Sequence, residues 1–187
     1  MRTSRWYFAI ATGLIILDQL LKFLVKGGTI MGFHHQGMYL GESFPLLGEA
    51  VRITFVENPG MAFGISWGSG KVILTSITIL IAIALAYIMH SRTESTTLER
   101  TSFMLIFAGA VGNLIDRMFY GALYGEGPLF EGKVVDFLQV DIPDITWFGV
   151  DYTHFPVFNL ADSCVSIGVV LMLIASFLVP ATSGPQE

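Results

Sequence analysis

Four long apolar stretches alternate with polar segments along the chain. They cover residues 6–25, 72–89, 101–120 and 157–179. Each approaches the ~20 residues that a helix needs to cross a hydrocarbon core. The second stretch is uncharged, whereas the other three carry acidic residues. The pattern predicts an all-α membrane protein in which four transmembrane helices form a single integral membrane domain, residues 1–187.

The two long connecting segments, residues 26–71 and 121–156, differ in character from the apolar stretches. The first contains a β-prone run at residues 51–56 followed by Asn58, Pro59 and Gly60, which favours strands and turns over another helix. The second is rich in glycine and acidic residues. We expect both segments on the outer side of the membrane, with residues 121–133 as a mobile flap that becomes ordered when substrate binds.

Orientation follows from the density of lysine and arginine. Arg2, Arg5, Arg92 and Arg100 fall in the short segments of one side, whereas the much longer segments of the other side hold equally few basic residues. Both termini are therefore predicted to be cytoplasmic. The first stretch mimics a signal peptide, but no A-x-A cleavage site follows it, so we expect an uncleaved helix.

Composition supports the bilayer as solvent. Apolar residues make up 53% of the chain and charged residues 13%, and the mean hydropathy is +0.65; soluble domains carry about twice that charged fraction. The net charge of -5 without a basic cluster argues against nucleic-acid binding. Cys164 is the single cysteine, which excludes an intrachain disulfide, and His34-His35 lacks a clear third ligand. We expect neither a metal nor a cofactor.

Polar residues within the stretches converge on one membrane boundary. In the predicted topology the first and third helices run outward and the fourth starts outside, so their polar positions all fall near the outer face. Many are spaced i,i+3 or i,i+4 and therefore share a helix face. The residues are Asp18, Lys22, Asn113, Asp116, Arg117, Asn159 and Asp162.

Charges inside a membrane are costly and usually mark function, although snorkelling of Asp18 and Lys22 to the interface stays an alternative. Two close carboxyls share one proton: the ionised member can deprotonate water while the protonated member polarises a peptide carbonyl. Asp136, outside the stretches between apolar neighbours, offers a second acid. This pattern indicates an aspartic peptidase. A proton-coupled transporter and a non-enzymatic scaffold are the rival interpretations.

Five motifs along the chain resemble those of the lipoprotein signal peptidases (signal peptidase II). They occur in the family's order and span most of the chain. They are Asp18-Gln19-x-x-Lys22, Asn58-x-Gly60-x-Ala62-Phe63, Gly112-Asn113-x-x-Asp116-Arg117, Val135-Asp136-Phe137 and Phe158-Asn159-x-Ala161-Asp162.

The resemblance implies an enzyme of the bacterial cytoplasmic (inner) membrane with its site near the outer face. It implies removal of signal peptides from prolipoproteins by cleavage before a diacylglyceryl-modified cysteine. It also implies a small extracytoplasmic β-cradle around Asn58, lying on the membrane. The spacing from Arg117 to Asp136 and on to Asp162 is longer than in compact family members, which leaves the shape of the outer loops open. We expect a monomer whose other partners are membrane lipids.

The family's catalytic pair corresponds to Asp136 and Asp162. Asp116 is the competing acid, but the adjacent charge of Arg117 favours a permanently ionised, structural carboxylate. The resemblance assigns support of the site to Asn58, Asn113, Arg117, Asn159, Asp18, Lys22 and Asp116. Whether Arg117 pairs with Asp116 or binds a substrate carbonyl is open from sequence.

Overall fold

The computed structural model describes residues 2–30, 32–60, 70–91, 95–147 and 150–178. Several features singled out in the sequence lie outside these residues. They are Ala62 and Phe63 of the second motif, Arg92 of the basic segment, and the tail from residue 179 onward.

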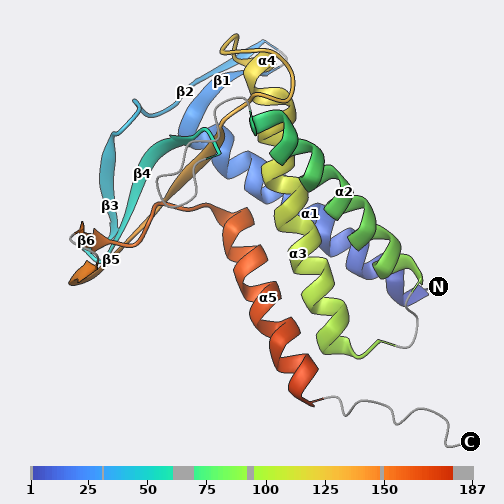
Figure 1. Ribbon diagram of the computed structural model, residues 1–187. Coiled ribbons are helices and arrows are strands. Elements are labelled where there is room, and N and C mark those ends of the chain that lie inside the picture. The colour runs from blue at the N-terminus through green and yellow to red at the C-terminus, as the bar shows by residue number, and fades with distance from the viewer. Residues whose placement is uncertain (1, 31, 61–69, 92–94, 148–149, 179–187) are drawn as a thin grey trace, which may run out of the picture.

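Long apolar helices dominate the described residues (Figure 1). Four of them are long and apolar enough to cross a membrane, which confirms the predicted fold class. Large apolar side chains such as Ile73 and Phe177 are exposed along them, as lipid contact requires. The helices are α1 (Arg2–Lys26), α2 (Lys71–Ser91), α3 (Thr97–Ile115) and α5 (Leu160–Leu178).

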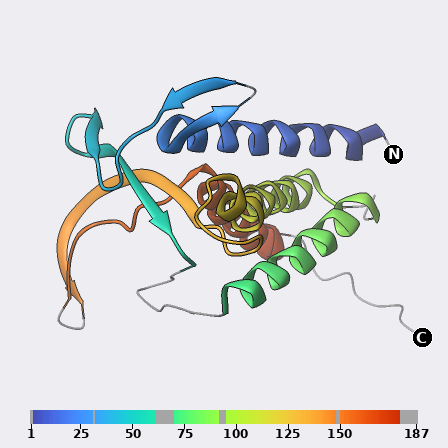
Figure 2. The same ribbon diagram turned by 90° about the horizontal axis from the view of Figure 1, so that it is seen from above.

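Helix α3 is the centre of the bundle. It contacts α1, α2 and α5, and Figure 2 shows α1 and α2 on opposite sides of it. Glycines make the close approach to α5 possible. A Cβ on Gly109 would lie 2.6 Å from Val165 Cγ2, and one on Gly168 would lie 2.7 Å from Ile106 Cγ1. Small residues at such crossings let helix backbones pack tightly in membranes.

The starts of α3 and α5 differ from the sequence prediction because local contacts define them. Thr96 and Glu99 form a capping box, so α3 begins at Thr97 within a stretch that reads as polar loop. Helix α5 begins at Leu160, since Phe158 forms a β-bridge with Leu138. At its other end α3 continues into a π-helical turn, η2 (Asp116–Tyr120), and a short helix, α4 (Gly121–Leu123).

Two antiparallel sheets lie at one end of the bundle (Figure 1). A two-stranded sheet pairs β1 with β2, and a four-stranded sheet has the order β3-β4-β5-β6. The β-prone run at residues 51–56 falls in β4, as expected from the sequence. The strands are β1 (Gly27–Ile30), β2 (Phe33–Gln36), β3 (Ser43–Leu47), β4 (Val51–Asn58), β5 (Val134–Trp147) and β6 (Val150–His154).

Different segments of the chain lie at the sheet end and at the opposite end of the bundle. The start of α1, the end of α2, the start of α3 and the end of α5 all lie at the end away from the sheets (Figure 1). At the sheet end, Val25 of α1, Tyr120 of η2 and Phe55, Val135 and Phe137 of the strands form one buried cluster. This cluster fixes strands β4 and β5 against the ends of α1 and α3.

Candidate active site

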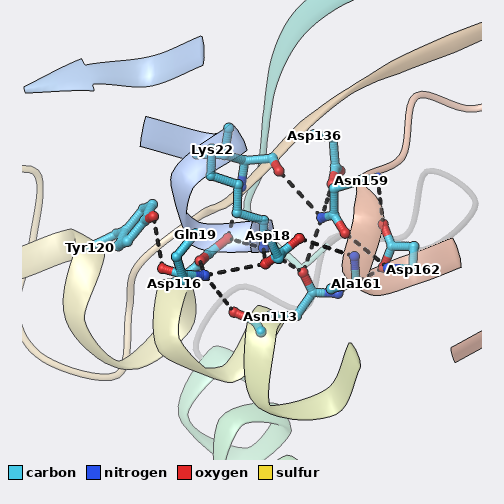
Figure 3. A network of polar contacts seen from close by, with 12 residues as sticks. Asp18, Gln19, Lys22, Asn113, Asp116, Tyr120, Asp136, Asn159, Ala161 and Asp162 are labelled. Atoms are coloured by element: carbon cyan, nitrogen blue, oxygen red, sulfur yellow. Dashed lines mark hydrogen bonds and ion pairs between the residues drawn. The ribbon is translucent and has the colours of Figure 1, made fainter. Parts of the chain in front are cut away.

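A buried lysine lies at the centre of the polar network (Figure 3). Lys22 of α1 is fully buried. Its Nζ lies 2.8 Å from Asp18 Oδ2 and 2.7 Å from Asp116 Oδ2, and it donates to Asn113 Oδ1 at 3.0 Å. The i,i+4 spacing places Asp18 and Lys22 on one face of α1. Both side chains are buried inside the protein, at 1% and 0% exposure, which argues against snorkelling to the interface.

Gln19 and Tyr120 complete the network and were not assigned from the sequence. The Gln19 amide donates to Asp116 Oδ1 at 2.9 Å, to Gly112 O at 3.1 Å and to Asp18 Oδ2 at 3.2 Å. Tyr120 OH donates to Gln19 Oε1 at 3.0 Å, which fixes the amide with its NH₂ toward the carboxylates. The signal for Gln19 was its place in the first motif, and that for Tyr120 its i,i+4 spacing from Asp116.

Two of the buried acids hold backbone groups beside the predicted catalytic pair. Asp116 Oδ2 accepts a hydrogen bond of 3.2 Å from the N–H of Val135, which precedes Asp136. Asp18 Oδ1 accepts one of 3.0 Å from the N–H of Ala161, which precedes Asp162. Since Lys22 pairs with both acids, it joins β5 to the start of α5.

Two asparagines connect the network to the pair. Asn113 Nδ2 donates to Asp162 Oδ1 at 2.7 Å. Asn159 Nδ2 donates to Asp136 Oδ1 at 2.7 Å and to Asn113 Oδ1 at 3.0 Å. Asn159 therefore lies between the two carboxyls, as Figure 3 shows. Because Asn113 Oδ1 accepts from Lys22 as well, its amide orientation is determined.

Asp162 takes part in the cap of α5. The Asp162 N–H donates to Asn159 Oδ1 at 2.9 Å, and the Asn159 N–H donates to Asp162 Oδ2 at 3.2 Å. This reciprocal pair has the geometry of a capping box, and it holds the carboxyl at the positive end of the helix dipole. Both Asp162 oxygens thus accept N–H hydrogen bonds while the side chain stays partly exposed. The arrangement holds both carboxyl oxygens in place on a side chain that water can reach.

Asp136 has a drier setting on β5. It pairs in register with Val56 of β4, is 2% exposed and is flanked by buried Val135 and Phe137. Burial, followed by the Asp162 charge, raises the pKa of Asp136 to about 7, against the lowering effects of hydrogen bonds from Asn58 and Asn159 and of the Lys22 charge. Asp136 is therefore suited to hold a proton near neutral pH.

Arg117 of η2 has no ion-pair contact with Asp116 among the described residues, since Asp116 is taken by Lys22 and Gln19. Its buried Nε has no hydrogen-bond partner within the described part of the chain. The charge is still close enough to act on Asp162, Asp116 and Asp136. The guanidinium also lines a small pocket with Gly60, Thr75 and Gly132. Among the described residues, no ion pair therefore holds the Arg117 guanidinium.

All the site residues expected from the sequence gather at the sheet end of the bundle. The network runs unbroken from Asp18 and Lys22 to Asp136 and Asp162, with Asn58 joining through Asp136. Within the described ranges, no group of three or more histidine, cysteine, aspartate or glutamate side chains could hold a metal ion. The chemistry available here is that of two unequal carboxyls with amide and guanidinium donors around them.

Known proteins resemble this chain over nearly its whole length. A family model described as "Signal peptidase (SPase) II" matches residues 10–178. The lipoprotein signal peptidase of Chlorobium phaeobacteroides (strain BS1) is 35% identical over 168 residues, which cover 90% of this chain and 93% of that protein. The lipoprotein signal peptidase of Staphylococcus aureus (strain JH9) is 36% identical over 179 residues, covering 95% and 90%.

A solved structure has the same fold. A bacterial membrane enzyme determined by the in meso method at 2.3 Å resolution superposes with a TM-score of 0.69 at 34% sequence identity. The match covers 97% of this chain and 93% of that one. The similarity therefore includes the sheets as well as the helices.

Proposed function

The chain belongs to the signal peptidase II family of aspartic peptidases, and we propose that Asp136 and Asp162 are the carboxyl pair with which it hydrolyses its substrate. It is a lipoprotein signal peptidase, an aspartic-type endopeptidase of a bacterial membrane that processes prolipoproteins. This membership favours the peptidase over the transporter and the scaffold. The bond cleaved is the one before the diacylglyceryl-modified cysteine, so that the acyl chains stay in the lipid.

The observation that carries the assignment is the unequal setting of the two acids on either side of Asn159. Asp162 accepts two N–H hydrogen bonds and is partly exposed, so its carboxyl is held in place where it can take a proton from water. Asp136 is buried with its pKa raised to about 7, which favours the protonated form. A pair with one proton is the arrangement that general acid–base hydrolysis needs.

The proposed reaction proceeds by direct attack of water. Asp162 removes a proton from a water molecule as its oxygen attacks the scissile carbonyl carbon, and Asp136 gives its proton to the carbonyl oxygen. When the tetrahedral intermediate collapses, the C–N bond breaks and Asp162 gives the proton it took from water to the leaving amine. Asp136 takes a proton back from a hydroxyl of the intermediate, which becomes the carbonyl of the new carboxyl group, so the pair returns to its starting state.

Arg117 and the asparagines have supporting roles. The Nε of Arg117, which has no hydrogen-bond partner among the described residues, would donate to a backbone carbonyl of the substrate. Asn58 and Asn159 each donate to Asp136, and Asn113 donates to Asp162. These bonds hold the two carboxyls before substrate arrives, and such preorganisation lowers the barrier because no reorientation is needed during reaction.

We further propose that the enzyme works as a single copy in contact with lipid, with its sheet end and active site at the outer face of the cytoplasmic membrane. The density of basic residues near the opposite end supports this orientation. A substrate signal peptide would then enter sideways from the bilayer and present its cleavage site at the outer boundary.

The decisive experiment is cleavage of a diacylglyceryl-modified prolipoprotein by the purified protein in lipid. Asp136→Asn and Asp162→Asn should each abolish turnover, because an amide can neither take the proton from water nor cycle a proton. Asp144→Asn, an exposed acid elsewhere on β5, is the matched control and should keep wild-type activity. If Asp136→Asn retains substantial turnover while a well-folded Asp116→Asn has none, Asp116 takes the place of Asp136.

A further inference from the structure

Four charged side chains meet beside the active site and outside its network. Lys26 ends α1, Glu57 lies on β4, Glu126 follows α4, and Lys133 directly precedes β5. Glu57 pairs with both lysines, with Lys133 at 2.5 Å, and Glu126 lies 2.6 Å from Lys26 and 3.9 Å from Lys133. We call these four residues the ionic latch. They come from parts of the chain that no other described ion pair connects.

Glu57 is the central and least solvated acid of the ionic latch. Its side chain is 9% exposed, against 33% for Glu126. Burial raises the pKa of Glu57, but hydrogen bonds from Lys133 and Lys26 outweigh it, so the pKa lies below its ordinary value. The stabilisation that the charge provides is therefore complete above the ordinary glutamate pKa and is lost only as the pH falls through the lowered value. At neutral pH Glu57 therefore keeps its ion pairs with Lys26 and Lys133.

The strand register connects Glu57 to the active site. Glu57 pairs with Val135, and Val56 pairs with Asp136. Since successive side chains of a strand point to opposite faces, Asn58 lies on the same face as Asp136 while Glu57 points to the latch. Asn58 Oδ1 accepts a hydrogen bond of 3.0 Å from the Gly60 N–H, which leaves its NH₂ for Asp136. The last residues of β4 thus join the latch on one face to Asp136 on the other.

The latch also holds the glycine-rich segment of residues 121–133. Phe130 N–H donates to Met118 O at 3.0 Å, and Gly132 N–H donates to Arg117 O at 2.9 Å. A Cβ added to Gly132 would lie 2.1 Å from Asp116 O, so no larger residue fits at this position. The last residues of the segment are therefore held by η2 and, through Lys133, by Glu57. Whether it moves when substrate binds stays a prediction.

We propose that Glu57 is a positioning residue that acts through Asn58 on Asp136, and that the ionic latch keeps the end of β4 in register with the active site. This inference rests on the proposed role of Asp136. Lys26 and Lys133 supply the two opposing anchors, so the strand end is held from α1 and from the start of β5 at once. Loss of the Glu57 charge removes the ion pairs that join both lysines to β4, although the lysines keep Glu126, and so frees the strand end.

Glu57→Gln tests the inference, with Glu49→Gln as matched control. Glu49 pairs with Arg52 in an exposed ion pair beside the same strand, and such pairs contribute little. Glu57→Gln should lower kcat by about tenfold, less than the hundredfold that an ångström of misplacement costs, and leave KM unchanged. Its kcat profile should lose activity at a higher pH than wild type, because the Asn58 hydrogen bond lowers the pKa of Asp136. Glu49→Gln should match wild type.

The shift in the profile separates positioning from simple loss of stability, which would lower the active fraction at every pH. The charged groups that act on Asp136 are Asp162 of α5, Lys22 of α1 and Arg117 of η2, and all three stay in place in Glu57→Gln. Wild-type kcat with a wild-type profile in Glu57→Gln overturns the inference.

Lys133→Met and Glu126→Gln provide two further tests. If Glu57→Gln does not fold, Lys133→Met decides, because it removes one anchor at a partly exposed position; an unshifted profile there overturns the inference. Glu126→Gln leaves both ion pairs of Glu57 intact, so its pH profile of kcat should not shift. A shift as large as that of Glu57→Gln would mean that the 121–133 segment causes the effect, and it would also overturn the inference. Absence of cleavage by the wild-type protein instead contradicts the proposed function.

Discussion

Each acid of the proposed catalytic pair follows a residue whose backbone N–H is held by a different buried acid. Asp116 holds Val135 before Asp136, and Asp18 holds Ala161 before Asp162. One ammonium, that of Lys22, pairs with both holding acids. At the residue scale, therefore, the geometry of the pair depends on side chains that take no part in the proposed proton transfers.

Asp116→Asn should weaken the fold more than the chemistry. An amide at this position removes the ion pair with Lys22, although Asp18 still neutralises the lysine. We expect a loss of about 1–3 kcal/mol in the free energy of unfolding, the range for a disturbed buried polar contact. Thermal unfolding of the detergent-solubilised protein measures it. An unchanged melting temperature together with a lost kcat would make Asp116 part of the chemistry instead.

The pH dependence of the reaction should follow Asp136. Its pKa is raised to about 7 by burial and by the Asp162 charge, and the proposed mechanism needs it protonated. Activity should therefore be retained below about pH 7 and decrease as the pH rises through that value. In Asn58→Ala, which removes a hydrogen bond that lowers the pKa of Asp136, the decrease should move to higher pH. A move to lower pH would show that Asp136 is not the proton donor.

At the scale of elements, helix ends and a π-helical turn build the site. The cap of α5 includes Asp162 itself, and η2 carries Asp116, Arg117 and Tyr120 at the end of α3. π-helical turns are frequent at functional sites because they alter the directions of side chains within a helix. Here η2 directs Asp116 and Tyr120 to Gln19.

The α3–α5 contact should be sensitive to side-chain volume. Gly109→Ala puts a methyl group against the backbone of α5 and 2.6 Å from Val165. Overpacking of this kind costs about 1–3 kcal/mol, and any shift of α5 also moves Asp162. The melting temperature and kcat should both fall. Gly13→Ala on α1 is the control, since nothing lies within 4 Å of its added Cβ; an equal effect there would refute the packing explanation.

At the scale of the whole molecule, one end of the bundle holds the site, and the other is formed by the far ends of the four long helices (Figure 1). The described polar network is confined to the sheet end. A relay of acids across the membrane, as a proton-coupled transporter would need, is not seen among the described residues.

Topology gives a test at this scale. A reporter fused after Glu187 should be cytoplasmic, and one inserted near Gly127 should be external, because basic residues are dense on the side of the termini. Alkaline phosphatase and fluorescent-protein fusions measure the two sides. The reverse pattern would put the carboxyls on the cytoplasmic face, out of reach of a cleavage site at the outer boundary.

Patterns along the chain were enough to predict the four spans, the β4 strand and the convergence of polar residues. These depend on local rules. A run of ~20 apolar residues is long enough to cross a bilayer, and i,i+3 or i,i+4 spacing puts Asn113 with Asp116, and Asn159 with Asp162, on shared helix faces. The motifs added the peptidase family, which the comparisons confirm.

Only the tertiary structure decided which polar groups meet. Gln19 and Tyr120 are far apart in the chain, yet their contact orients an amide toward two buried acids. The sequence also offered no strand at Asp136, whose place on β5 depends on pairing with Val56. Such contacts are non-local, so spacing along the chain does not encode them. They exist because buried polar groups must find partners, and only the folded chain shows which partners are within reach.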